Sequence, residues 1–219
     1  KIYKRGLLDL QDDIRLSLRQ LDYFNDPEAY DKEQQLKAMS IAIEAVLMLA
    51  KRYAEKCQAL ALTEASPVRR QELEHIAAVC RHVPAYAPRT FHEALQAYWF
   101  VHLGVITELN VWDSYNPGRL DQHLAPFYDA ETAAGTLTKE AAKELLECFW
   151  IKFNNQPAPP KVGITEEQSG TYTDFALINV GGLNPETGED AVNDVSYLIL
   201  DVVEEMQIVQ PSCCIQISR

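Results

Sequence analysis

The chain has 219 residues, of which 47% are hydrophobic and 24% are charged, as expected of a folded globular protein rather than a disordered one. Its formal net charge of −12 disfavours nucleic acid and anionic membranes as partners, because their phosphate groups would be repelled. No apolar run reaches the roughly 18–20 residues that span a bilayer, and the first residues lack the apolar stretch of a signal peptide. The chain starts without Met inside a helix-like pattern, so we expect it to begin within a longer protein.

The first part of the chain is predicted to be mainly helical. Apolar residues recur every three or four positions over 7–24 and again over 32–62, which is the spacing of amphipathic helices. Proline stands at the first position of a third predicted helix, Pro67–His82. Residues 83–88 read VPAYAP, and a residue before proline is biased away from helix. An extended linker is therefore expected there.

The segment at 90–109 is apolar on almost every face. It reads TFHEALQAYWFVHLGVITEL and opens with the capping residue Thr90. A helix of this kind is buried on all sides, so we expect His102 within it to find a hydrogen-bond partner. Two more helices are predicted, one after Pro117–Gly118 and one over 139–153.

The pattern then changes to loops and short strands. A proline-rich stretch at 154–163 leads to a β-rich segment at 173–182. A helical pattern at 191–209 leads to a last apolar segment at 211–218. Strand, helix and strand in this order form the βαβ unit of an α/β sheet or barrel. One such unit cannot close a barrel, so the fold class is α/β with an incomplete sheet.

The stretch ELNVWDSYNPGRLDQH (108–123) places polar side chains beside a turn. Asp113 follows a tryptophan at the exit of the apolar helix, where a carboxylate suits charge-assisted binding of an amine. The alternative is structural: Asp113 caps a helix end, and Arg119 and Asp121 form an ion pair. Residue chemistry alone leaves both interpretations open.

Two other stretches invite chemical interpretations. SGTYTDF (169–175) is either a capped turn that feeds a strand or the polar rim of a barrel mouth. Cys213 and Cys214 are expected to be buried as small apolar residues of a strand, with side chains on opposite faces. Five cysteines at irregular spacing argue against a disulfide framework and favour a reducing cytoplasm. Gly181-Gly182 lacks the spacing of a dinucleotide fingerprint, and we assign it no phosphate role.

Long motifs in the chain resemble a known family. RTFHEALQAYWFVHLG, WDSYNPGRLDQHLAPFY, GTLTKEAAKELLECFWIKFNNQPAPPKVG and SGTYTDFALINVGG are similar to stretches of the glycyl radical enzymes of the pyruvate formate-lyase-like group, and the resemblance runs from about Tyr3 to Arg219. The family fold is a barrel of two half-barrels wrapped in helices. The resemblance therefore implies that residues 1–219 are part of a single domain. Its helical shell would occupy 1–153, and the first barrel strands and a crossover helix would occupy 154–219.

The resemblance also implies a chemistry. Family members store a radical on a backbone glycine, installed by a radical S-adenosylmethionine activating enzyme that carries an iron–sulfur cluster. The radical moves to a cysteine, which abstracts hydrogen from a small-molecule substrate. TELNVWD and FNNQPAPPKVGIT resemble, within the family, dehydratases that remove water from a hydroxylated cyclic amino acid to leave a pyrroline carboxylate. A homodimer is the implied assembly of the full-length enzyme.

Three site residues carry over by resemblance. Asp113 matches the carboxylate that holds the ring amine of the substrate, and Ser169 and Phe175 match positions that line the pocket. The catalytic cysteine and glycine loops are expected beyond Arg219, so we expect this chain alone to be inactive and to bind no cofactor or metal directly. Cys213-Cys214 stands where the dehydratase-like pattern has Ser-Asn, and it is not expected to replace the missing thiol.

Two other functions stay open from the sequence. One is another lyase of the same group, such as a formate acetyltransferase, a glycerol or diol dehydratase, or an enzyme that splits a C–N or C–S bond. The other is a non-catalytic helical scaffold.

Overall fold

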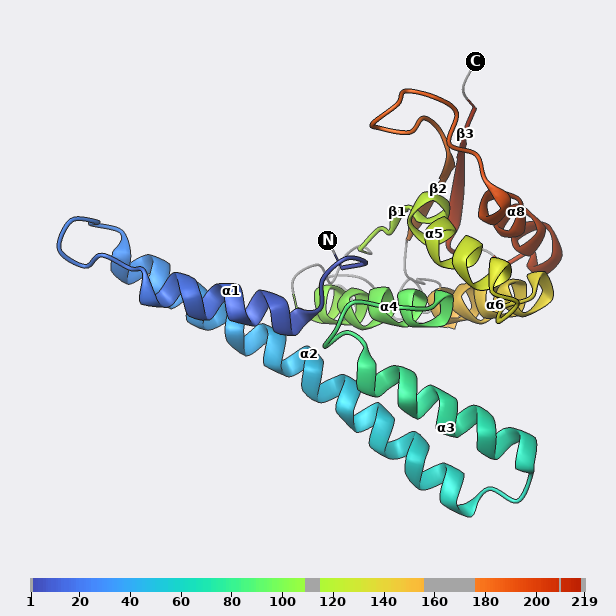
Figure 1. The fold of residues 1–219 in the computed structure, drawn as a ribbon, viewed down its shortest axis with the longest axis horizontal. Coiled ribbons are helices and arrows are strands. Elements are labelled where there is room, and N and C mark those ends of the chain that lie inside the picture. Colours follow the sequence, from blue (N-terminus) through green and yellow to red (C-terminus); the bar gives the residue numbers. More distant parts are fainter. Residues whose placement is uncertain (1, 109–114, 156–175, 209, 218–219) are drawn as a thin grey trace, which may run out of the picture. The chain divides into compact units, whose positions relative to one another are not determined.

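The computed structural model describes residues 2–108, 115–155, 176–208 and 210–217 (Figure 1). The chain divides into two compact units. The first comprises Lys1–Arg89 with Gln96–Val101, and the second comprises Thr90–Leu95 with His102–Arg219. The assignment of residues 1–219 to a single domain stays a prediction. Over the described part of the chain, no helix is both long and apolar enough to cross a membrane.

The first unit is built on one long helix. Its three helices are α1 (Leu7–Arg19), α2 (Ala29–Thr63) and α3 (Pro67–His82). Both α1 and α3 pack on α2, one along each half of its length (Figure 1). Small side chains allow a close approach where α3 meets α2: Ala50 and Ala54 cluster with Cys80 and Phe100. The predicted start of α3 is confirmed, with Pro67 in its first turn and the Ser66 hydroxyl accepting the Arg69 N–H.

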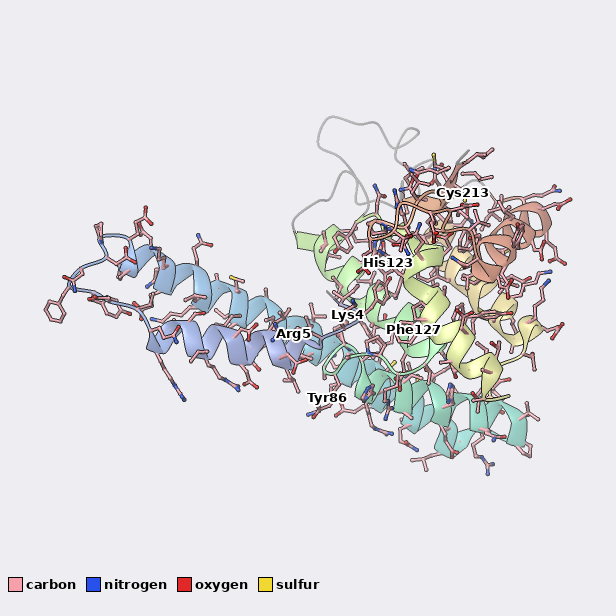
Figure 2. The ribbon with its side chains drawn as sticks, turned by 45° about the horizontal axis from the view of Figure 1, so that its top comes forward. Lys4, Arg5, Tyr86, His123, Phe127 and Cys213 are labelled. Atoms are coloured by element: carbon pink, nitrogen blue, oxygen red, sulfur yellow. The ribbon has the colours of Figure 1, made fainter. Side chains whose placement is uncertain are left out.

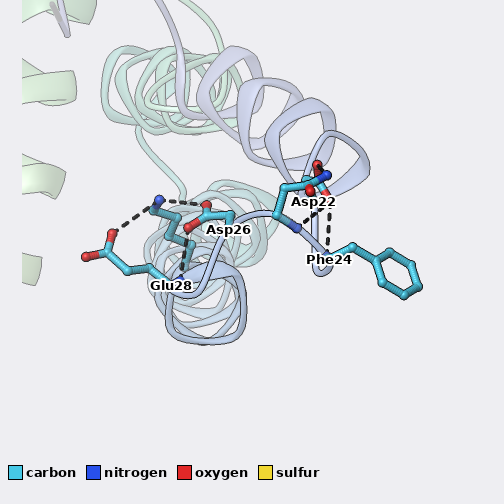
Figure 3. A network of polar contacts seen from close by, with 6 residues as sticks. Asp22, Phe24, Asp26 and Glu28 are labelled. Carbon is cyan, nitrogen blue, oxygen red and sulfur yellow. Dashed lines mark hydrogen bonds and ion pairs between the residues drawn. The ribbon is translucent and has the colours of Figure 1, made fainter.

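The turn between α1 and α2 is held by two carboxylates (Figure 3). Asp22 accepts the backbone N–H groups of Phe24 and Asn25 at 3.0 and 3.1 Å, and Asp26 pairs with Lys32 in the first turn of α2 at 2.8 Å. These contacts lower the pKa of both aspartates below the ordinary value, through Asn25 for Asp22 and chiefly through Lys32 for Asp26. The predicted helix over 7–24 therefore ends early, because Asp22 satisfies backbone groups in a turn instead of a helix.

The second unit combines helices with a small parallel sheet. Its helices are α4 (Phe91–Glu108, of which Gln96–Val101 belongs to the first unit), α5 (Leu120–Ala133), α6 (Lys139–Asn155) and α8 (Asp194–Met206). Its strands are β1 (Gly118–Arg119), β2 (Leu177–Gly181) and β3 (Ser212–Gln216). All pair in parallel in the order β1-β2-β3. The predicted β2, α8 and β3 are confirmed, while the two-residue β1 was not predicted.

The core of this unit lies between the sheet and its helices. Helices α5 and α8 pack against each other and against β2, and α6 packs on α8. These elements contribute many of the largest fully buried side chains: Leu120, Leu124, Leu146, Trp150, Phe153, Ile178, Leu198 and Ile199. The prediction that the 90–109 helix is buried on nearly every face is also confirmed over its described side chains.

One carboxylate ties the sheet to two helices. Asp121 of α5 is fully buried, with 0% of its surface exposed. It accepts the Gly181 N–H at 2.7 Å and the Ser196 hydroxyl at 2.5 Å. Ser196 in turn accepts the Asn193 N–H in the first turn of α8, so its hydroxyl proton is left to donate to Asp121. The end of β2 is thereby joined to α5 and α8.

Replacing Asp121 with asparagine is expected to lower the free energy of unfolding by about 1–3 kcal/mol, because the amide presents N–H donors where two donors need an acceptor. Urea unfolding followed by tryptophan fluorescence measures the loss. The matched control is Asp129→Asn, an exposed carboxylate of the same helix, expected to change stability by less than about 0.5 kcal/mol. Equal effects of the two substitutions would contradict the role of Asp121.

The sheet has an open edge within the described residues. No described strand pairs with the outer side of β3, and Ile215 and Ile217 are 54% and 89% exposed. An unpaired apolar edge is a template for association with another chain. Residues 1–219 produced alone are therefore expected to be marginally stable or to aggregate, as measured by circular dichroism and size-exclusion chromatography. A compact monomer that unfolds cooperatively would show that the edge needs no partner.

Candidate functional site

The three predicted site residues fall in two segments of the chain. Asp113 belongs to 109–114, and Ser169 and Phe175 belong to 156–175. Both segments lie outside the described residues, so the roles of the three residues stay predictions. The residues that border the two segments lie within the described part of the chain.

The two segments rejoin the described chain side by side. Because β1 and β2 are parallel, the chain enters both strands at the same edge of the sheet. The side chain of Asn116, just before β1, accepts the Leu177 N–H of β2 at 2.8 Å. Pro117, which follows Asn116, has no N–H to donate to a ladder. An asparagine side chain therefore extends the contact between the strands beyond the first backbone pair.

The ends at which the chain leaves for the two segments are also in contact. His102 of α4 is fully buried, and its ring lies edge-on to Phe153 of α6, with 4.9 Å between the ring centroids. The His102 Nδ1 lies 3.1 Å from the Tyr115 carbonyl oxygen. A carbonyl can only accept, so Nδ1 carries the proton. The expectation that His102 is hydrogen-bonded is confirmed.

These contacts join all four chain ends that border the two segments. We call the five residues that make them the collar: His102, Tyr115, Asn116, Phe153 and Leu177. Helix α4 precedes the first segment, and Tyr115 follows that segment. Helix α6 precedes the second segment, and Leu177 lies just after that segment. Sequence reasoning missed Asn116, because a hydrogen bond to a residue 61 positions later leaves no local signal.

The polar side chains at the end of β1 and in the first turn of α5 mostly make hydrogen bonds to the backbone of the same unit. Arg119 donates to the Leu183 carbonyl, and the Gln122 amide donates to the Gly181 carbonyl at 2.8 Å. The expected ion pair between Arg119 and Asp121 is wrong, because Asp121 is occupied by Gly181 and Ser196. Desolvation lowers the pKa of His123 below its ordinary value.

The paired glycines have a packing role. Gly181 and Gly182 have φ angles of 76° and 83°, which favour glycine. A Cβ atom on Gly181 would lie 2.6 Å from the Gln216 carbonyl oxygen of β3. That same oxygen accepts the Gly182 N–H at 3.0 Å. The glycines therefore let the ends of β2 and β3 approach closely.

The two cysteines of β3, of which Cys213 is labelled in Figure 2, differ in burial. Cys213 is partly buried and Cys214 is exposed. Burial, with smaller contributions from Cys214 and Asp121, raises the pKa of the Cys213 thiol to about 11. The expectation that both are buried is wrong for Cys214, because β3 is the outer strand of the described sheet and alternate side chains point to opposite faces.

Comparisons with known proteins agree along the whole chain. The model of the "Pyruvate formate lyase-like" family matches residues 1–219. Trans-4-hydroxy-L-proline dehydratase of Clostridioides difficile is 56% identical over 218 residues, covering 100% of this chain and 28% of the relative. Isethionate sulfite-lyase of Nitratidesulfovibrio vulgaris is 34% identical over 220 residues, covering 99% of this chain and 26% of the relative.

Solved structures show the same relationship in three dimensions. The crystal structure of the C. difficile hydroxyproline dehydratase with trans-4-hydroxy-L-proline bound superimposes with a TM-score of 0.93, covering 100% of this chain and 28% of the other at 56% identity. The glycerol-bound, B12-independent glycerol dehydratase of Clostridium butyricum gives a TM-score of 0.84 at 30% identity, covering 99% of this chain and 27% of the other.

The chain thus spans little more than a quarter of the length of these relatives. Both its sequence and its arrangement of helices and parallel strands match theirs throughout. The chain belongs to the pyruvate formate lyase-like family.

Proposed function

We propose that the chain is part of a glycyl radical dehydratase that removes water from trans-4-hydroxy-L-proline to give a pyrroline-5-carboxylate. The observation that carries the proposal is the 56% identity to a trans-4-hydroxy-L-proline dehydratase over the full chain, against 34% to an isethionate sulfite-lyase over the same region. The higher identity favours trans-4-hydroxy-L-proline over isethionate as the substrate.

In this function the chain supplies one wall of the substrate pocket. The Asp113 carboxylate would balance the charge of the ring ammonium, which needs a counter-charge once it leaves water. Ser169 and Phe175 would contribute a hydroxyl group and an aromatic face to the same pocket. The collar supports this assignment, because it joins the chain ends that border the segments of all three residues.

The reactive groups would come from other parts of the full-length enzyme. A glycyl radical, installed by an activating enzyme that uses S-adenosylmethionine and an iron–sulfur cluster, would supply the oxidising equivalent for hydrogen abstraction by a cysteine. The residues of this chain would bind and orient the substrate. We expect the full-length enzyme to be a homodimer. We also expect it to lie in the reducing cytoplasm, where the thiols of Cys57 and Cys80 would persist.

A second candidate is another lyase of the family. Isethionate sulfite-lyases are about a third identical to this chain over the matched region, and a glycerol dehydratase shares the fold. Such an enzyme would keep the sheet and the collar but would not need a carboxylate facing an amine.

Substitution of Asp113 distinguishes the two candidates. In the full-length activated enzyme, Asp113→Asn is expected to lower kcat/KM for trans-4-hydroxy-L-proline by about 10–100-fold, because a charge-assisted hydrogen bond to the ring ammonium is lost. Steady-state assay of pyrroline-5-carboxylate measures the loss, and the exposed Asp129→Asn is the control. If the Asp113→Asn enzyme turns over trans-4-hydroxy-L-proline at nearly the unmodified rate, Asp113 does not bind the ring ammonium.

The thiol of Cys213 is expected to be inert. A pKa of about 11 instead of 9.0 leaves about 100-fold less thiolate at pH 8, and the thiolate is the nucleophile. In a Cys214→Ser background, iodoacetamide should modify Cys213 slowly at pH 8, and the rate should rise about tenfold per pH unit up to about pH 11. Peptide mass spectrometry of the full-length, unactivated enzyme follows this reaction. Rapid modification at pH 7, or loss of dehydratase activity in Cys213→Ala, would instead indicate a reactive thiol.

A further inference from the structure

We propose that two copies of the full-length enzyme meet along α2, with the two helices antiparallel. The surface involved is the outward face of α2, defined by Tyr30, Ile41, Met48 and Leu62. The inference rests on the homodimer expected under the proposed function, and it adds the part of the chain at which the copies meet. It does not depend on the identity of the substrate.

The outward face of α2 is apolar and exposed. The exposed fraction of each side chain lies between 61% and 79% for Tyr30, Ile41, Met48 and Leu62. Ile41 and Met48 are seven residues apart, Leu62 follows fourteen residues later, and Tyr30 precedes Ile41 by eleven. With about 3.6 residues per turn, each of these steps is close to a whole number of turns. The four side chains therefore lie along one line of the helix, and such an exposed apolar line suits packing against a second helix.

The side of α2 that packs on α3 points away from this face. Ala50 and Ala54 cluster with Cys80 of α3 and with Phe100. They follow Met48 by two and six residues, which turns their side chains by about 200° and 240° around the helix axis. A partner on the outward face therefore leaves the packing of α3 in place.

Charge is distributed unevenly along the first unit. Residues 22–33, in the turn before α2 and at its start, include five acidic residues and one lysine. Residues 51–70, at the end of α2 and the start of α3, include five basic residues and two acidic ones. A parallel copy would bring like charges together, whereas an antiparallel copy brings opposite charges together. Because one chain carries both complementary surfaces, a second copy of it supplies both at once in a two-fold symmetric pair.

Antiparallel pairing about the middle of α2 also matches individual side chains. Val46 is the middle residue of the 35 in α2. Tyr30 and Leu62 both lie sixteen residues from Val46, and Lys37 and Glu55 both lie nine residues from it. In the pair, Tyr30 then lies beside the partner's Leu62, and Lys37 lies beside the partner's Glu55. Apolar groups meet apolar groups, and opposite charges become neighbours.

The turns at the two ends of α2 extend this match. Phe24 is 100% exposed, and its ring points away from the helices (Figure 3). Val68, at the start of α3, is 69% exposed and is followed by Arg69 and Arg70. Phe24 lies 22 residues before Val46, and Val68 lies 22 residues after it. The pairing therefore brings the exposed ring and its acidic turn to the basic end of the other copy, where apolar surface is removed from water.

A charge placed on the outward face tests the interface. In the full-length, unactivated enzyme, Met48→Glu is expected to raise the dissociation constant of the dimer at least about tenfold, because a carboxylate without a partner loses its water. Sedimentation velocity over a range of concentrations measures the constant. The matched control is Met39→Glu, since Met39 is 52% exposed and lies nine residues, or about two and a half turns, before Met48 on the opposite side of the same helix. The control should stay within about threefold of the unmodified enzyme.

Charge reversal tests the antiparallel register. Lys37→Glu and Glu55→Lys are each expected to raise the dissociation constant about three- to fivefold, because like charges then face each other across the pair. The double variant should return to within about twofold of the unmodified enzyme. Within one copy the two residues lie about 27 Å apart along the helix, so only a contact between copies produces this rescue.

The outcomes separate this inference from the proposed function. Dissociation of Met48→Glu together with rescue by the double reversal supports the antiparallel interface. If Met48→Glu dimerises like the Met39→Glu control, or lowers only the melting temperature, the copies meet elsewhere and the inference is wrong, while the expected homodimer stands. Single reversals that weaken the dimer without rescue overturn the antiparallel arrangement. If the unmodified enzyme is monomeric, the inference and the expected homodimer are both wrong, and the proposed reaction is still tested by Asp113→Asn.

Discussion

The arrangement of the sheet depends on a buried carboxylate that is held by hydrogen bonds. Asp121 is fully buried and is satisfied by a backbone N–H of β2 and a hydroxyl of α8. A buried charge is tolerated only when hydrogen bonds replace its hydration. Its donors come from residues 60 and 75 positions later in the chain. The carboxylate can therefore be buried only when strand and helices have assembled around it, which makes the network selective for this topology.

The two ends of the β1–β2 pair are held by different means. At the carboxyl end of β2, Asp121 and Gln122 bind both backbone groups of Gly181. At the amino end, contacts made by Asn116 and His102 replace a backbone ladder. Backbone pairing is regular and leaves little freedom, whereas side-chain contacts can be changed by substitution. Side chains therefore contribute at both ends of the pair, and the amino end is the one at which the chain enters from the two segments.

Much of the fold could be predicted because its signals are local. Helical periodicity gave the helices that became α2 and α3, and the change to a βαβ pattern gave β2, α8 and β3. Strand β1 has two residues, which is too short for any period to be visible. The partners of Asp121 are also invisible in the sequence, because a hydrogen bond over 60 or 75 positions leaves no local pattern. Arg119 and Asp121 therefore suggested an ion pair, although each has another partner in the structure.

The candidate site was less accessible to residue chemistry than the fold. Composition and spacing left the role of Asp113 open, and resemblance to a family supplied the expectation of an amine partner. The proline that follows Asn116 lacks a donor, whereas the Leu177 N–H needs an acceptor, so the hydrogen bond of Asn116 could not be predicted from the proline. The identity of that partner, Leu177, again depended on a contact between distant parts of the chain.

The family comparison adds a constraint on where substrate choice can reside. A glycerol dehydratase at 30% identity keeps this fold with a TM-score of 0.84, so the backbone framework is compatible with a substrate that has no ring amine. A framework shared by enzymes with different substrates cannot by itself select among them. Selection must then come from side chains placed on the framework, and from the contacts that fix their position. In this chain the segments that carry Asp113 and Phe175 rejoin the described residues at the same end of the β1–β2 pair.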